Sequence, residues 1–145
     1  MRALVQRVTE ASASVDGEVV GQIGAGLCVL VGVTHEDDEA VARAMADKIW
    51  NLRLMDDGGG VMNLSVAETT KAVLVVSQFT LYGDTSRGRR PSWIKAARPE
   101  RAEPLVDIVV ARLRDLGATV ATGRFRTTMQ VALVNDGPAT ILLEL

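Results

Sequence analysis

The unbroken apolar run LCVLVGV, residues Leu27–Val33, constrains the fold more than any other stretch. A run of this length without polar residues predicts a strand buried in the core. Before it, ALVQRV is followed by ASASV, and the strong hairpin-turn dipeptide Asp16-Gly17 separates this stretch from the strand-like run EVVGQI. The first 33 residues therefore predict three strands.

The second half of the chain predicts further strands. KAVLVVSQFTLYG, rich in β-branched residues, predicts one long strand over residues 71–83. TVATGRF, MQVALV (Met129–Val134) and ATILLEL (Ala139–Leu145) predict the last strands. Asn135–Pro138, between the last two runs, consists of common turn residues and predicts a turn that joins them as a hairpin.

Two segments have a helical period instead. The first begins at about Asp37, and its apolar face consists of Val41, Met45, Ile49 and Leu52. The second begins near Pro99, has Gly117 as its C-terminal cap, and presents Leu105, Val109, Leu113 and Leu116 on one face. This order predicts an α+β fold of mostly antiparallel, barrel-like sheets packed with two main helices. With 145 residues, the chain is predicted to be one domain, 1–145.

The sequence lacks the residues that several kinds of metal site and catalytic site require. His35 is the only histidine and Cys28 the only cysteine, which excludes zinc sites built from several such ligands. No acidic spacing points to a carboxylate site, and serine-hydrolase, phosphate-loop and dinucleotide motifs are missing, so we expect no metal and no cofactor. Cys28 is predicted to be a buried, inert thiol. The single cysteine predicts a cytoplasmic location, and no apolar run approaches the ~20 residues of a membrane span.

Positive charge is concentrated in one segment, although the whole chain carries a net charge of −2. Between Ser86 and Arg101 there are six basic residues and one acid, Glu100, a local balance of +5. The basic residues are Arg87, Arg89, Arg90, Lys95, Arg98 and Arg101. Such a segment either attracts phosphate groups or is a solvated loop whose arginines pair with nearby carboxylates.

Polar residues interrupt the apolar pattern at SQFTLYGD, residues Ser77–Asp84. Within a buried strand, Ser77, Gln78 and Thr80 need hydrogen-bond partners or a ligand. One interpretation is a strand that passes from core to surface, with Phe79 in the core. The other is the wall of a pocket, where exposed backbone N–H groups hold an oxyanion.

SQFTL in mid-chain and NDGPAT about 55 residues later resemble the paired motifs of the D-aminoacyl-tRNA deacylases. The resemblance extends over nearly the whole chain through QRV, GQIGAGLCVLVGV, MNLSV, RGRRPSW, TGRF and MQVALVNDGP. One departure is Ala139, at a position where this family usually has Val, and the smaller side chain puts the packing behind the loop in doubt.

The resemblance implies a homodimeric hydrolase with two pockets at the subunit interface. Its substrate is the ester that joins a D-amino acid to the terminal adenosine of tRNA. The Gly137–Pro138 peptide bond is expected to be cis, and this loop is expected to enter the partner's pocket, where its carbonyl oxygens reject an L side chain. Glycyl-tRNA mischarged on alanine tRNA is also an expected substrate.

The same resemblance implies roles for individual residues. Ser77 and Gln78 would contact substrate, and the backbone N–H groups of Phe79 and Thr80 would form the oxyanion hole. A competing mechanism uses the Thr80 hydroxyl as nucleophile, for which no base is evident.

The resemblance places the roles of the remaining residues less specifically. Arg7 either braces the Gly-Pro loop or forms a surface ion pair, and Phe125 and Met129 either line the pocket or belong to the core. Arg87, Arg89, Arg90, Lys95 and Arg98 would meet tRNA phosphates. Two alternatives are a non-catalytic tRNA-binding module of the same fold and a deacylase of altered chirality preference.

Overall fold

The computed structural model describes residues 1–145. Its central sheet has six strands in the order β2-β1-β3-β6-β7, with β8 paired to β1. These strands are β1 (Arg2–Val15), β2 (Glu18–Ile23), β3 (Gly26–Gly32), β6 (Ala72–Ser77), β7 (Val120–Thr122) and β8 (Gln130–Glu144). A small separate hairpin is formed by β4 (Met55–Asp56) and β5 (Met62–Leu64). The helices are α1 (Glu39–Trp50), α2 (Pro99–Asp115) and the short 3-10 helices η1 (Val66–Glu68) and η2 (Phe79–Tyr82).

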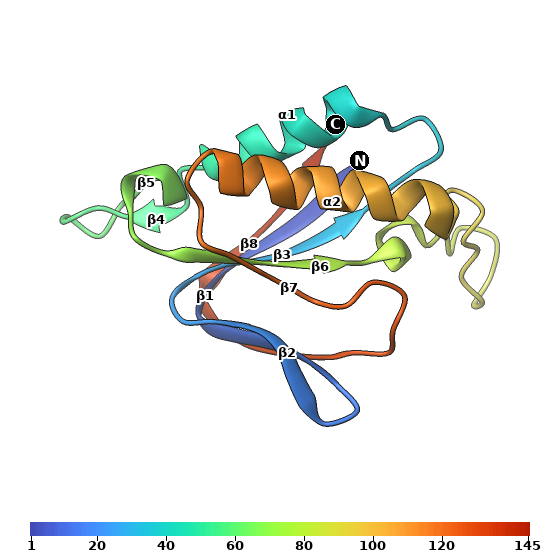
Figure 1. Cartoon of the computed structure of the whole chain (residues 1–145), viewed down its shortest axis with the longest axis horizontal. Coiled ribbons are helices and arrows are strands. Elements are labelled where there is room, and N and C mark those ends of the chain that lie inside the picture. Colours follow the sequence, from blue (N-terminus) through green and yellow to red (C-terminus); the bar gives the residue numbers. More distant parts are fainter.

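The sheet curls into a nearly closed barrel, and α1 and α2 pack side by side on one side of it (Figure 1). Gly21 of β2 approaches the carbonyl group of Thr122 in β7 so closely that a Cβ would not fit there, so the two ends of the sheet nearly meet. The predicted α+β fold, with a barrel-like sheet and two main helices, is confirmed. None of the helices is long and apolar enough to cross a membrane.

The pairing of the strands is antiparallel around β1 and parallel beyond β3. β1 pairs antiparallel with β2, β3 and β8, whereas β3–β6 and β6–β7 are parallel. Each parallel pair is joined by a crossover that contains a helix, α1 in the first and α2 in the second. The two helices thereby come to the same side of the sheet.

β3 is buried because hydrophobic cores cover both of its faces. Leu27, Val29 and Val31 pack in the larger core between the sheet and the two helices. Cys28 faces the smaller core inside the curl of the sheet, together with residues such as Val8, Leu74 and Val76. Burial raises the pKa of the Cys28 thiol to about 11, so it stays protonated and unreactive, as predicted.

The helix ends follow the residues that predicted them. Asp38 caps α1 by accepting a hydrogen bond from the Val41 N–H at 2.9 Å. α2 starts at Pro99, and Gly117 follows its end with a φ of +103°, a conformation that favours glycine. Leu52, predicted to continue the apolar face of the first helix, lies just beyond its end.

The long strand predicted over residues 71–83 is wrong beyond Ser77. β6 ends there, and the chain turns into η2. The ladder between β3 and β6 ends at the pair Val31–Ser77, and the Gln78 N–H makes one more bond to the Val31 carbonyl at 2.7 Å. Because β3 itself ends at Gly32, no partner strand remains for Phe79 and the residues after it. The strand predicted from TVATGRF is likewise shorter, covering only Val120–Thr122.

The hairpin predicted at Asn135–Pro138 is also wrong. Both apolar runs belong to the single strand β8, and both pair antiparallel with β1. Gln6 lies opposite Thr140 and Val8 opposite Asn135, so residues 136–139 lie opposite Arg7 alone. The turn-forming residues therefore make a large bulge within one strand. The Gly137–Pro138 peptide bond in this bulge is cis.

Candidate active site

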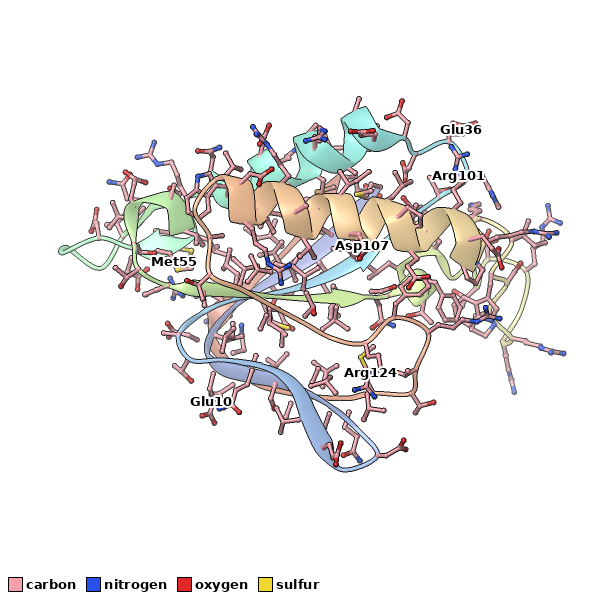
Figure 2. All side chains as sticks on the ribbon, viewed as in Figure 1. Glu10, Glu36, Met55, Arg101, Asp107 and Arg124 are labelled. Atoms are coloured by element: carbon pink, nitrogen blue, oxygen red, sulfur yellow. The ribbon has the colours of Figure 1, made fainter.

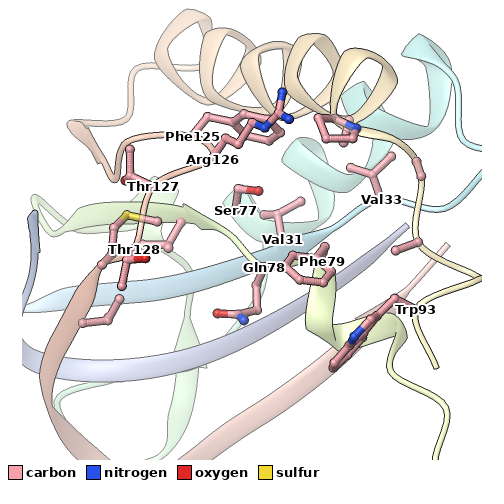
Figure 3. Close-up of a pocket in the computed structure, with 17 residues that line it drawn as sticks. Val31, Val33, Ser77, Gln78, Phe79, Trp93, Phe125, Arg126, Thr127 and Thr128 are labelled. Carbon is pink, nitrogen blue, oxygen red and sulfur yellow. The ribbon is translucent and has the colours of Figure 1, made fainter. Parts of the chain in front are cut away.

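A cavity of about 600 Å³ opens at the carboxyl ends of the three parallel strands. Its walls come from the ends of β3 and β6, from η2, from the segment that leads into α2, and from the loop between β7 and β8 (Figure 3). Its volume falls in the range of sites that bury one small-molecule ligand. The edge where parallel strands end is also a recurrent location for ligands.

Five residues that the sequence singled out line this cavity: Ser77, Gln78, Phe79, Phe125 and Met129. Ser77 is the last residue of β6 and Gln78 follows it just before η2, and both side chains line the cavity (Figure 3). Met129 is held against Gly123, where a Cβ would lie 2.7 Å from its sulfur. The structure thus brings together two segments about 50 residues apart in the sequence, and each forms part of the cavity wall.

The start of η2 presents two backbone donors without partners. The first N–H groups of a helix have no acceptor within it, and neither Phe79 nor Thr80 donates its N–H to another group. The Thr80 side chain is exposed and does not line the cavity. Its hydroxyl accepts a hydrogen bond from the Gln78 amide, which is a neutral donor and not a base.

Arg7 ties the Gly-Pro bulge to the body of the fold. Its side chain is only 8% exposed, and its Nε donates to the Asp136 carbonyl at 2.8 Å. Its Nη1 donates to the Leu54 carbonyl at 3.0 Å and to Asp56 Oδ1 at 2.7 Å. The side chain of Asn135 in turn donates to the carbonyl groups of Arg7 and Ala139 at 3.0 and 3.1 Å. Arg7 therefore braces the bulge. Its ion pairs with Asp56 and Asp136 are made by a buried guanidinium group, unlike the surface ion pair of the other alternative.

Gly137, Pro138 and Arg7 do not line the cavity of their own chain. Gly137 and Pro138 are exposed on the outer side of β8, whereas Ala139 is buried in the larger core. Within the single chain, the bulge and the cavity thus lie apart.

The basic segment forms an exposed loop after η2, and side chains with nitrogen ends project from that end of the fold (Figure 2). Arg87, Arg89, Arg90 and Arg98 form no side-chain hydrogen bond or ion pair. Lys95 pairs with Asp84 at 3.3 Å. Hydrogen bonds from Ser86, together with the Lys95 charge, lower the pKa of Asp84 to about 2. The four free guanidinium groups favour the phosphate-attracting interpretation over pairing with carboxylates.

Sequence reasoning missed part of the cavity wall. Ala96, Ala97 and Ala102 leave room for a ligand beside α2, and Thr127 and Thr128 line the opposite side. Small residues near a helix start carry no signal in a single sequence. Trp93, which lies within the basic segment, also lines the cavity.

The sequence model of the family described as D-Tyr-tRNA(Tyr) deacylase matches residues 4–144. The chain belongs to this family. Relatives named D-aminoacyl-tRNA deacylase include those of Symbiobacterium thermophilum and Nocardia farcinica, both 60% identical to the chain. The alignments cover 99% of the chain and 95% and 99% of the two relatives.

Two solved structures resemble the chain along its whole length. One, described as c-Myc DNA Unwinding Element Binding Protein, is 40% identical, has a TM-score of 0.95, and is matched over 100% of this chain and 99% of that one. The other, described as a probable eukaryotic D-amino acid tRNA deacylase, has a TM-score of 0.85 over 99% of this chain and 98% of its own. At 15% identity, the second shows that the fold is shared.

Proposed function

We propose that this chain hydrolyses the ester bond of D-aminoacyl-tRNA in the cavity beside η2 and releases the D-amino acid and free tRNA. Membership of the deacylase family supports the enzyme class and tRNA as the substrate. The observation that carries the proposal is that SQFT, the motif shared with the family, lies at a cavity with two free backbone N–H donors.

The proposed chemistry uses position and backbone polarity rather than a side-chain base. Water attacks the ester carbonyl carbon, and the N–H groups of Phe79 and Thr80 stabilise the negative charge on the carbonyl oxygen. The carbon–oxygen bond to the terminal ribose then breaks, and the ribose oxygen takes a proton that the attacking water has lost. The neighbouring ribose hydroxyl assists this proton transfer. Ser77 and Gln78 hold the aminoacyl group, while Phe125 and Met129 contact the adenosine or aminoacyl part.

The function is tested by the release of D-tyrosine, L-tyrosine and glycine from charged tRNA, with and without a chelator. We expect release of D-tyrosine and of glycine, the latter from alanine tRNA, and no release of L-tyrosine above the uncatalysed rate. tRNA binding without release of D-tyrosine would identify a non-catalytic module instead. Release of L-tyrosine would identify a deacylase of altered chirality preference, and loss of activity with chelator would exclude the metal-free mechanism.

Thr80→Ala is expected to keep turnover to within about tenfold of the wild type, because it removes one hydrogen bond worth about 0.5–1.5 kcal/mol and leaves the backbone N–H in place. Single-turnover rates with D-tyrosyl-tRNA measure this, and Thr80→Ser is the matched control that keeps the hydroxyl. A folded but inactive Thr80→Ala beside an active Thr80→Ser would establish the hydroxyl as nucleophile and reject the backbone mechanism.

We propose further that two chains pair so that the bulge of one enters the cavity of the other. Three observations support this pairing: the bulge is exposed, it is braced from behind by Arg7, and it lies outside its own cavity. β8 is an edge strand that exposes Val131, Val134, Ile141 and Leu142, as an interface strand does. Light scattering should then give a mass of twice 15.5 kDa, and a monomer would reject the shared site.

In such a site, the backbone carbonyl groups around Gly137 and Pro138 would meet the side chain of an L-aminoacyl group. A D side chain points away from these oxygens, and glycine has no side chain to exclude. Broad specificity for D-amino acids follows, because the discrimination depends on the backbone and not on a pocket for one side chain.

The arginines of the exposed loop are proposed to contact tRNA phosphates. Replacing Arg87, Arg89 and Arg90 together by Gln is expected to reduce the slope of log(kcat/KM) against log salt by about 2 to 3, close to one for each lost phosphate contact. Arg43→Gln on α1 is the control, since Arg43 already pairs with Glu39 at 2.7 Å. Equal slopes in the triple variant and the wild type would contradict this role.

A further inference from the structure

We propose that the indole ring of Trp93 is a stacking platform for the base of the nucleotide that precedes the terminal adenosine of tRNA. This inference rests on the proposed function and adds to it a second subsite outside the cavity. Trp93 is 41% exposed and lines the cavity at its rim, so one part of its ring borders the cavity and another part faces solvent.

The ring is held in a fixed orientation. Phe79 packs against it edge to face, with ring centroids 5.3 Å apart and planes at 72°. On another side the six-membered part of the indole lies against Gly83, where a Cβ would come within 2.6 Å of it. A preorganised aromatic ring loses little freedom when a base stacks on it.

The surroundings of Trp93 match an RNA strand better than a protein partner. Phe79 and Ile94 beside it are 53% and 82% exposed, which makes an apolar surface at the mouth of the cavity. The same segment carries a net charge of +5, and its Arg87, Arg89, Arg90 and Arg98 have no carboxylate partner. An aromatic surface among free cations is the combination that binds single-stranded nucleic acid, with bases on the rings and phosphates on the charges.

The volume of the cavity and the position of Trp93 indicate which nucleotide of the tRNA stacks on the ring. A cavity of about 600 Å³ is filled by one ligand the size of an aminoacyl-adenosine. Trp93 and Phe125 stand at different ends of it (Figure 3). With the terminal nucleoside inside, the nucleotide before it has to leave the cavity, and the way toward the basic loop passes Trp93.

The test compares two substrates that share the reacting group. D-tyrosyl-tRNA carries the preceding nucleotide, whereas D-tyrosyl-adenosine does not. Trp93→Leu is expected to lower kcat/KM by about 10- to 100-fold on the tRNA substrate, the usual effect of losing one stacked base. The loss on the adenosine ester is expected to be at least about threefold smaller, because only the contacts of Trp93 with the cavity are lost there. Trp93→Phe, which keeps an aromatic face, is expected to recover most of the loss.

A binding measurement needs no turnover. In a Trp50→Phe background Trp93 is the only tryptophan, and its fluorescence is expected to be quenched by the trinucleotide CCA but not by adenosine.

Two kinetic outcomes would overturn the inference. If Trp93→Leu lowered kcat/KM equally on both substrates, the ring would only support the cavity. If it lowered kcat/KM on neither substrate, the ring would have no role. A wild-type chain inactive on D-tyrosyl-tRNA would instead refute the proposed function, and the fluorescence titration would still decide on the platform.

Discussion

Gly137→Ala is expected to lower kcat/KM for D-aminoacyl-tRNA by about 100-fold or more while the chain remains folded. A Cβ at this position would lie less than 3.0 Å from both the Asn135 side-chain oxygen and the Ala139 backbone nitrogen. The Asn135 amide cannot swing away without losing its bonds to the carbonyl groups of Arg7 and Ala139. The backbone of the bulge must therefore shift, and displacements of about 1 Å in a positioning element are known to reduce rates by about 100-fold.

Gly58→Ala is the matched control, because no atom lies within 4 Å of the Cβ that it would add. Steady-state kinetics with D-tyrosyl-tRNA, and circular dichroism to verify folding, make the comparison. If Gly137→Ala and Gly58→Ala were equally active, the bulge would have no part in the site.

If two chains pair as proposed, mixed dimers would reveal which chain supplies the bulge. We expect Gly137→Ala and Phe125→Ala to be weakly active alone and to regain roughly a quarter of wild-type activity when refolded together, since random pairing leaves one intact site in each mixed dimer. Absence of recovery in verified mixed dimers would place the bulge and the cavity of each site in the same chain.

Gly26→Ala is expected to reduce the free energy of unfolding by about 3 kcal/mol or more. Gly26 begins β3 opposite Ala72 of β6, and a Cβ there would lie well under 3.0 Å from the Ala72 carbonyl oxygen. The backbone of β6 cannot move aside as a flexible side chain could. The added Cβ therefore forces β3 and β6 apart locally, and such overpacking is strongly destabilising. Denaturation in guanidinium chloride measures the change.

Gly24→Ala, two residues earlier, is the control for this prediction. A Cβ at Gly24 has no atom within 4 Å, so the free energy of unfolding should change by no more than about 0.5 kcal/mol. If Gly26→Ala and Gly24→Ala had similar denaturation midpoints in guanidinium chloride, β3 and β6 would be further apart at Gly26 than in the structure.

The elements that could be predicted are those whose residues determine them locally. Leu27–Val33 is apolar throughout because a core lies on each face of β3. The helices were predicted because their apolar residues recur at helical spacing, and because Pro99 and Gly117 act at the ends of α2 through local geometry.

The errors arose where a distant partner decides the local structure. Asn135–Pro138 has turn chemistry, but it forms a bulge because β1, more than 120 residues earlier, pairs with the chain on both sides of it. The strand through Ser77 ends where its neighbour β3 ends, which no residue of 71–83 reveals. The polar interruption at Ser77 and Gln78 left two interpretations open, and the cavity wall is the one that agrees with the structure. Ala96 and Ala102, which line the same cavity, offered no pattern in the sequence.

The pairing of β1 with β8 also has a consequence for the kinetics of folding. Arg2 lies opposite Glu144, so this ladder joins residues at the two ends of the sequence. Such non-local pairing must overcome a large loop-closure entropy before it contributes stability, so we expect it to form late in folding. Contacts that form after the rate-limiting step act chiefly on the unfolding rate. The strand that carries the Gly-Pro bulge is thus expected to determine how long the native chain persists rather than how quickly it forms.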